Sequence, residues 1–315
     1  MNSKKLWIAF SLFVVTAFSQ TSFAQGLNWE GQTGALLTPF AYTAGSPAGK
    51  FGKPEVAFHY LNAGNVIGNE YQFSVTEGFG KRFEAGFTEA FSSAGNTAVV
   101  SNLFTGGYTV LHGKFTVITE NSYKTKWVPA IAVGAVGRLG DERVYWDATA
   151  SGPSTPKGTS ADFYIVATKT VTQVKGFPFV LSLGDKLTNA SIMGIAGQAG
   201  TLNTLDQRWQ GRLFGAAAFV VKGPAKSALI FGAEAVQQPH YVQGLNVVLR
   251  NLTETSGVTA TIPTSLSYFV RVVPHLEGSP LQVDLGVVQA AGRIVPGVVN
   301  LNAQARVGMG VSYHF

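Results

Sequence analysis

The sequence predicts an all-β fold, a transmembrane antiparallel up-and-down β-barrel of about 12 strands (10–14) that is closed by the C-terminal strand. Apolar and polar residues alternate along many segments, which places the two kinds of side chain on opposite faces of a strand. After residue 24, no apolar run reaches the roughly 20 residues that a membrane-spanning helix needs. Short and long connections between the segments alternate, as is typical of bacterial outer-membrane barrels.

Residues 1–24 are predicted to be a signal peptide that is cleaved during export. Two lysines precede an apolar run from Leu6 to Phe18, and Ser22 and Ala24 supply the small residues expected before a cleavage site. The alternative is an uncleaved membrane anchor, for which the apolar run is short. Cleavage removes two lysines and no acids and lowers the formal net charge from +6 to +4. This modest charge predicts no nucleic-acid partner.

The composition excludes several classes of exported protein. The chain has no cysteine, so it has neither disulfides nor the lipid-anchored cysteine of a lipoprotein. Charged residues make up only 13% of the chain and hydrophobic residues 46%. A soluble β-sandwich, the competing interpretation, would have shorter strands and more charge on its outer faces. The composition therefore favours a surface that faces lipid.

The segment 25–52 precedes the first clear strand and is rich in Gly, Ala and Thr, with little charge. It is predicted to be either a plug inside the barrel or a periplasmic lead-in segment. The barrel itself is expected to occupy residues 53–315.

Twelve runs carry the alternation, although the run 113–119 competes with the preceding 104–112. Strands of about 9–11 residues suffice to cross a bilayer. The predicted strands are 54–61, 69–80, 82–91, 113–119, 128–139, 161–172, 177–187, 209–222, 227–237, 265–273, 281–290 and 301–315.

The last run, LNAQARVGMGVSYHF, alternates without a break over fifteen residues. It predicts that Val307 and Met309 face lipid and that Arg306 faces the lumen. The ending Tyr313-His314-Phe315 resembles the C-terminal signal of Gram-negative outer-membrane proteins. The resemblance implies a location in the cell outer membrane. It also implies two kinds of partner: the barrel assembly machinery, which would read Tyr313 and Phe315, and outer-membrane lipids with lipopolysaccharide.

Three stretches are similar to uncharacterised outer-membrane barrels related to the YjbH group. They are GQTGALLTPFAYTAGSPAGKFGKPEVAFHY near the N-terminus and the later PAIAVG and FYIVATK. Because that group is associated with exopolysaccharide production, the resemblance implies a role in assembly or export of envelope polysaccharide.

Charged residues on the polar faces of the strands are candidates to line the lumen. They either pair with one another across a filled interior or form a charged constriction that selects solutes. Because both signs occur in near balance, mutual pairing is the favoured role. The candidates are Arg82, Glu84, Arg212, Glu234, Arg271, Asp284 and Arg306.

The sequence offers no signature of catalysis. None of the five histidines has a serine two positions later, the Asp-x-His pattern is absent, and no metal-ligand cluster is apparent. We therefore expect neither an enzyme nor a cofactor. Twelve strands lie between the eight that side chains can fill and the 16–18 of open porins. A narrow passive conduit or accessory transport barrel is the first functional hypothesis, a polysaccharide-assembly component the alternative, and an enzyme the least favoured.

Overall fold

The computed structural model describes most of the chain after residue 25. The predicted signal peptide and residues 301–304 of the last predicted strand lie outside the described residues. Within the described part, no helix is long and apolar enough to cross a membrane. The described ranges are 26–62, 68–94, 107–140, 160–174, 177–189, 192–193, 199–200, 209–238, 261–274, 280–293 and 305–315.

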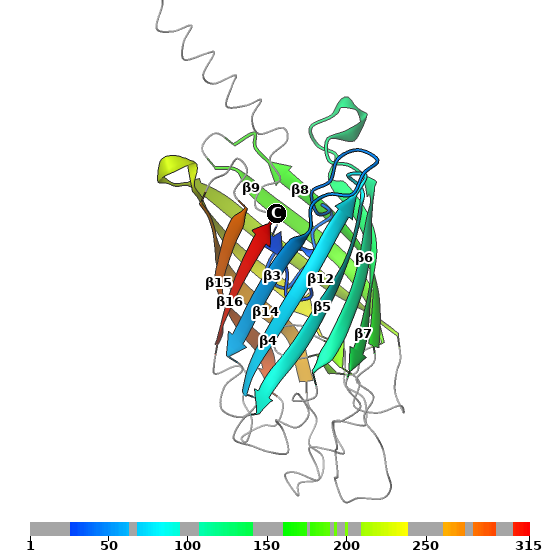
Figure 1. Cartoon of the computed structure of the whole chain (residues 1–315), viewed down its shortest axis with the longest axis vertical. Helices are drawn as coiled ribbons and strands as arrows, with labels where there is room; N and C mark the ends of the chain where they lie inside the picture. The colour runs from blue at the N-terminus through cyan, green and yellow to red at the C-terminus, as the bar shows by residue number, and fades with distance from the viewer. Residues whose placement is uncertain are drawn as a thin grey trace, which may run out of the picture.

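Twelve antiparallel strands form one closed barrel (Figure 1), which confirms the predicted fold class. The last strand pairs with both its predecessor and the first barrel strand, so the hydrogen-bond ladder has no free edge. The strands are β3 (Glu55–Asn62), β4 (Gly68–Phe79), β5 (Phe83–Ala94), β6 (Tyr108–Ile118), β7 (Ala130–Gly140), β8 (Ser160–Val171), β9 (Phe179–Thr188), β12 (Gln210–Lys222), β13 (Ala228–Gln237), β14 (Thr261–Val273), β15 (Leu281–Arg293) and β16 (Arg306–His314).

Two small hairpins and two 3-10 turns complete the described structure. β1 (Gly26–Leu27) pairs with β2 (Thr33–Gly34), and β10 (Ile192–Met193) pairs with β11 (Ala199–Gly200). The 3-10 turns η1 (Ser122–Lys124) and η3 (Pro224–Lys226) each connect two barrel strands.

The two ends of the barrel differ in the length of their connections. The short-turn end carries residues 80–82, 119–129, 172–178, 223–227 and 274–280, together with the C-terminus. The long-loop end carries the remaining connections, which reach 23 residues between β13 and β14 (238–260).

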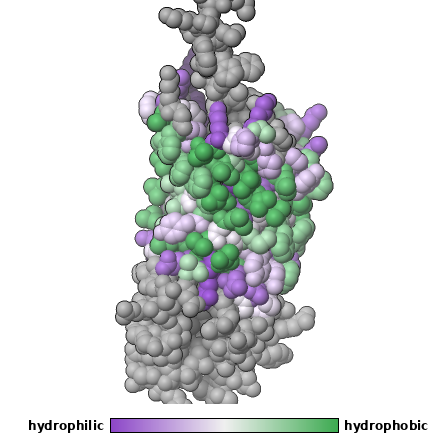
Figure 2. Space-filling model, turned by 90° about the vertical axis from the view of Figure 1, so that its left-hand side faces the viewer, coloured by the Kyte–Doolittle hydropathy of each residue, from purple (hydrophilic) through white to green (hydrophobic). Residues whose placement is uncertain are grey.

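Burial alternates along the strands as the sequence predicts. In β4, the inward side chains are buried and the outward ones are exposed or half-buried. On β16, Val307 and Met309 are exposed on the outer face while Arg306 lies on the inner face, which confirms the predicted register. On the face that Figure 2 shows, the outward side chains form an apolar belt with hydrophilic side chains above and below it.

Several strand boundaries differ from the predicted ones by a few residues, and the largest differences are at the starts of β6 and β16. β6 joins parts of the two competing runs into one strand, because both continue the same alternation. The last strand begins at Arg306 and covers nine residues rather than fifteen.

Inward aromatic rings pack against glycines of the neighbouring strand. Tyr164 lies directly across from Gly134, and a Cβ at Gly134 would come within 2.3 Å of the Tyr164 ring. The same pairing recurs around the wall, which explains part of the glycine content. The further pairs are Phe214 with Gly184, Phe269 with Gly232, His59 with Gly310 and His112 with Gly86.

We expect Gly134→Val to destabilise the barrel by about 1–3 kcal/mol through overpacking. Gly137→Val is the matched control, because Gly137 lies on the same strand but faces outward, where a Cβ would have its nearest neighbouring atom 4.0 Å away. Urea titration of the refolded proteins measures the difference. Equal midpoints for the two variants would contradict the ring-on-glycine packing.

Candidate functional site

Residues 26–44, here called the luminal segment, lie inside the barrel. All of them are buried except Tyr42, which is half-buried. The segment forms hydrogen bonds with inward side chains of β3, β4, β5, β6, β7, β8, β13 and β14, which surround it on all sides. Both of its ends lie toward the short-turn end, since Gly26 is next to Gln282 and Gly45 is next to His314.

A tight turn forms the tip of the luminal segment. The Asn28 side-chain oxygen accepts hydrogen bonds from the backbone N–H groups of Glu30 and Gln32. Gly31 has a φ of +85°, a conformation that glycine adopts without steric cost. This turn presents the Glu30 carboxylate toward the long-loop end, where it meets Arg138.

Glu234 of β13 holds the middle of the segment. Its carboxylate accepts hydrogen bonds from the consecutive backbone N–H groups of Leu36, Leu37 and Thr38, at 2.7–3.1 Å. The hydroxyl groups of Thr38 and Ser267 donate to the same carboxylate. Successive N–H groups that converge on one point form an anion-binding nest. Here the anion is the Glu234 carboxylate of the barrel wall, and the backbone N–H groups of the luminal segment form the nest.

Glu84 of β5 holds both arms of the segment. It accepts hydrogen bonds from the backbone N–H and hydroxyl of Thr33 and from the N–H of Ala44. Lys114 pairs with Glu84 at 2.8 Å and also donates to the Thr33 carbonyl. A single ion pair therefore fixes two points of the segment that are eleven residues apart in sequence.

Arg271 anchors the hairpin formed by β1 and β2. It pairs with Asp284 on the neighbouring strand at 2.6 Å and donates to the carbonyl oxygens of Gly34 and Ala35. The contact agrees with the predicted mutual pairing of wall charges, and it adds the segment as a third participant.

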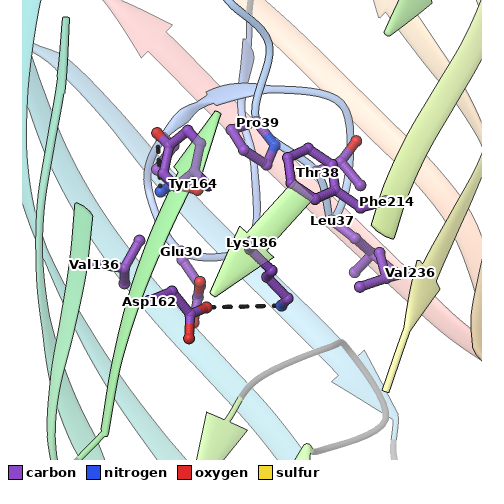
Figure 3. A pocket seen from close by; sticks show the side chains of 11 residues that line it. Glu30, Leu37, Thr38, Pro39, Val136, Asp162, Tyr164, Lys186, Phe214 and Val236 are labelled. Atoms are coloured by element: carbon purple, nitrogen blue, oxygen red, sulfur yellow. Dashed lines mark hydrogen bonds and ion pairs between the residues drawn. The ribbon is translucent and has the colours of Figure 1, made fainter. Parts of the chain in front are cut away.

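A network of four charged groups surrounds the tip. Arg138 donates to both carboxylate oxygens of Glu30, at 2.5 and 2.8 Å, and to Asp162 at 2.9 Å. Lys186 lies 3.6 Å from Asp162. A cavity of about 30 Å³ adjoins Glu30, Asp162, Tyr164 and Lys186 (Figure 3).

The segment leaves the barrel beside Tyr42. The Tyr42 hydroxyl donates to Glu120, which also accepts hydrogen bonds from Lys169 and from the backbone N–H of Thr170. Burial, together with the nearby Glu120 carboxylate, raises the pKa of Tyr42 above its usual value, so the phenol keeps the proton that it donates. A pocket of about 350 Å³ opens next to this exit.

The predicted lumen residues fall into three groups. Glu84, Glu234, Arg271 and Asp284 face inward and hold the luminal segment, Asp284 through Arg271. Arg212 and Arg306 lie half-buried on inner faces, Arg212 near the long-loop end and Arg306 near the middle of the barrel, across from Val288. The prediction for Arg82 is wrong. It is exposed in the turn between β4 and β5, because β5 begins only at Phe83.

Seven charged residues of the lumen are absent from the predicted set. Six of them occupy inward positions of predicted strands, where the same alternation could have identified them: Glu55, Glu70, Lys114, Arg138, Asp162 and Lys186. Glu30 had no such signal, because it lies outside every predicted strand.

The histidines of the lumen serve as hydrogen-bond donors. His59 donates to the Leu27 carbonyl. Because the Thr76 hydroxyl donates its proton to the Gly31 carbonyl, His112 is the donor in its hydrogen bond with Thr76. Within the described ranges, no group of three His, Cys, Asp or Glu residues is placed to hold a metal ion.

No protein-family model matches the chain, and no curated protein matches it in sequence. Similar solved structures include the KdgM porin, with 10% identity, a TM-score of 0.44 and coverage of 83% of this chain and 99% of that chain. LpxR from Salmonella typhimurium has 10% identity, a TM-score of 0.43 and coverage of 83% and 100%. The COG4313 outer membrane channel from Pseudomonas putida F1 has 10% identity, a TM-score of 0.41 and coverage of 86% and 97%. The likeness is confined to the arrangement of strands.

Proposed function

We propose that the protein is an outer-membrane conduit whose lumen is closed by its own luminal segment. The closed ladder and the apolar belt suit a bilayer, in which every backbone polar group must be paired and the outer face must be apolar. The short-turn end is then periplasmic, as in bacterial outer-membrane barrels. A solute passes only when residues 26–44 move.

The charged inner wall carries this proposal. A barrel that serves only as a scaffold can fill its interior with apolar side chains, whereas here Lys114, Arg138, Arg271, Glu84 and Glu234 line it. Their partners in the segment are mostly backbone groups and hydroxyls, which water can replace at a net cost of about 0.5–1.5 kcal/mol for each hydrogen bond. The wall is therefore suited both to hold the segment and to line an aqueous passage without it.

Single-channel recording in planar bilayers tests the proposal. The mature protein should be silent or nearly so, and a variant that lacks residues 26–44 should conduct. A polysaccharide-assembly component, which the YjbH-like stretches suggest, predicts that neither protein conducts. Silence of the deletion variant, when it migrates as a folded barrel on unheated gels, would therefore overturn the conduit.

A cysteine lock provides the converse experiment without a deletion. The Ala41 N–H lies 2.8 Å from the Thr168 hydroxyl, and the native chain has no cysteine to interfere. In the double variant Ala41→Cys, Thr168→Cys, oxidation should abolish any channel openings and reduction should restore them.

A further inference from the structure

Charge is distributed unevenly along the inner wall. In the long-loop half, the described inward side chains comprise the cations Arg138, Lys186, Arg212 and Arg306 and the carboxylates Glu70, Asp162 and Glu234. In the short-turn half, they comprise the cations Lys114 and Arg271 and the carboxylates Glu55, Glu84 and Asp284. An anion that enters from the long-loop end therefore meets a wall with more cations than carboxylates.

The luminal segment supplies the missing anion in the long-loop half. Glu30 binds Arg138 through two hydrogen bonds, so each carboxylate oxygen faces one N–H of the guanidinium fork. This planar, two-point contact is the geometry in which arginine binds carboxylates most strongly. Glu30 thus occupies Arg138 as a bound carboxylate ligand would.

The local charges balance only when one further negative charge is present. Arg138 and Lys186 contribute two positive charges and Asp162 contributes one negative charge. Glu30 brings the total to zero. The cluster is therefore neutralised by one negative charge, which Glu30 supplies as a carboxylate.

The cluster also keeps unused hydrogen-bonding capacity. The Nη1 atom of Arg138 and the Oδ1 atom of Asp162 are buried and have no hydrogen-bond partner among the described residues. Lys186 lines the adjoining cavity and lies 3.6 Å from Asp162. Figure 3 shows the Glu30 and Asp162 carboxylates and the Lys186 amine together at this cavity. The site can therefore rearrange around a different carboxylate.

We propose that Arg138 and Lys186 form a binding site for the carboxylate group of a solute, which Glu30 occupies as a built-in competitor. A carboxylate that arrives from the long-loop end exchanges with Glu30 at Arg138 and so releases the tip of the luminal segment. This inference rests on the proposed conduit, because it names the class of ligand that releases the luminal segment and so opens the conduit. The exchange moves no covalent bond, and one anion replaces another.

Trp29, next to Glu30, reports the exchange without any measurement of transport. It is 2% exposed and its ring lies 5.7 Å from that of His59, whereas Trp127 and Trp209 are exposed on the surface. In a mature protein in which Trp127, Trp146 and Trp209 are changed to Phe, Trp29 is the one remaining tryptophan. Acrylamide quenching of its fluorescence then measures how far the tip has left its site.

Sodium acetate is the probe, with ionic strength held constant by sodium chloride. Acetate should increase the quenching of Trp29 severalfold, and neutral acetamide should not. Glu30→Gln, which weakens the competitor, should lower the half-saturating acetate concentration about tenfold, because a neutral amide binds the Arg138 guanidinium less strongly than a carboxylate does. Arg138→Gln should remove the response to acetate. Arg306→Gln, which changes another cation of the same half, should retain it.

Two results would overturn the exchange. One is an equal effect of chloride and acetate, which would indicate simple screening of the ion pair. The other is an unchanged acetate response in Arg138→Gln. Either could occur while the variant without residues 26–44 still conducts, so this inference and the proposed conduit can fail separately.

Discussion

Val307→Arg should destabilise the inserted barrel by about 2–4 kcal/mol, while Arg306→Ser should leave insertion intact. Val307 is 58% exposed on the outer face and pairs with Val287, the middle residue of β15. Arginine on the lipid face near the bilayer midplane costs about 2–4 kcal/mol. Arg306 lies on the inner face, where a serine meets the polar lumen. Refolding titrations into lipid vesicles measure both free energies of unfolding.

The two positions are neighbours in one strand, so the comparison separates the direction of a side chain from its place in the sequence. Met309→Arg, also on the outer face, should behave like Val307→Arg. If Val307→Arg and Arg306→Ser were tolerated equally, the assigned register of β16 would be wrong, because a slip of one residue exchanges the two faces.

Glu234→Ala should release the luminal segment from the wall. The substitution removes the acceptor for the backbone N–H groups of Leu36, Leu37 and Thr38. Each buried donor left without an acceptor costs about 1–3 kcal/mol, so the bound state of the segment should lose about 3 kcal/mol or more. Limited proteolysis followed by mass spectrometry should then find new cleavage within residues 26–44.

Glu89→Ala is the matched control for Glu234→Ala. Glu89 also accepts a hydrogen bond from a neighbouring strand, from Thr109 at 2.7 Å, but it lies on the outer face away from the segment. Loss of the Glu89 carboxylate should leave residues 26–44 protected from proteolysis. Equal protection of the segment in both variants would show that Glu234 does not hold it.

The alternation of the sequence predicts the wall well, because the direction of a side chain in a strand depends only on its position modulo two. Glu84, Glu234, Arg271 and Asp284 were identified as inward residues on that ground alone. The wrong prediction for Arg82 has the same origin, because it too relied on alternation alone. Alternation does not show where a strand stops, and the turn between β4 and β5 covers residues 80–82 and so includes Arg82.

The periodicity of the sequence accounts for the barrel wall: the closed barrel, the faces of its strands and about half of the described charges that point inward. These follow from local alternation and from the need to pair every backbone group in a closed sheet. The choice between the two predicted places for the N-terminal segment depends instead on the tertiary fold. Leu36 is 198 residues from Glu234 and Thr33 is 51 residues from Glu84. Such hydrogen bonds join backbone groups to distant side chains and leave no periodic pattern, so they become visible only when the closed barrel brings their partners together.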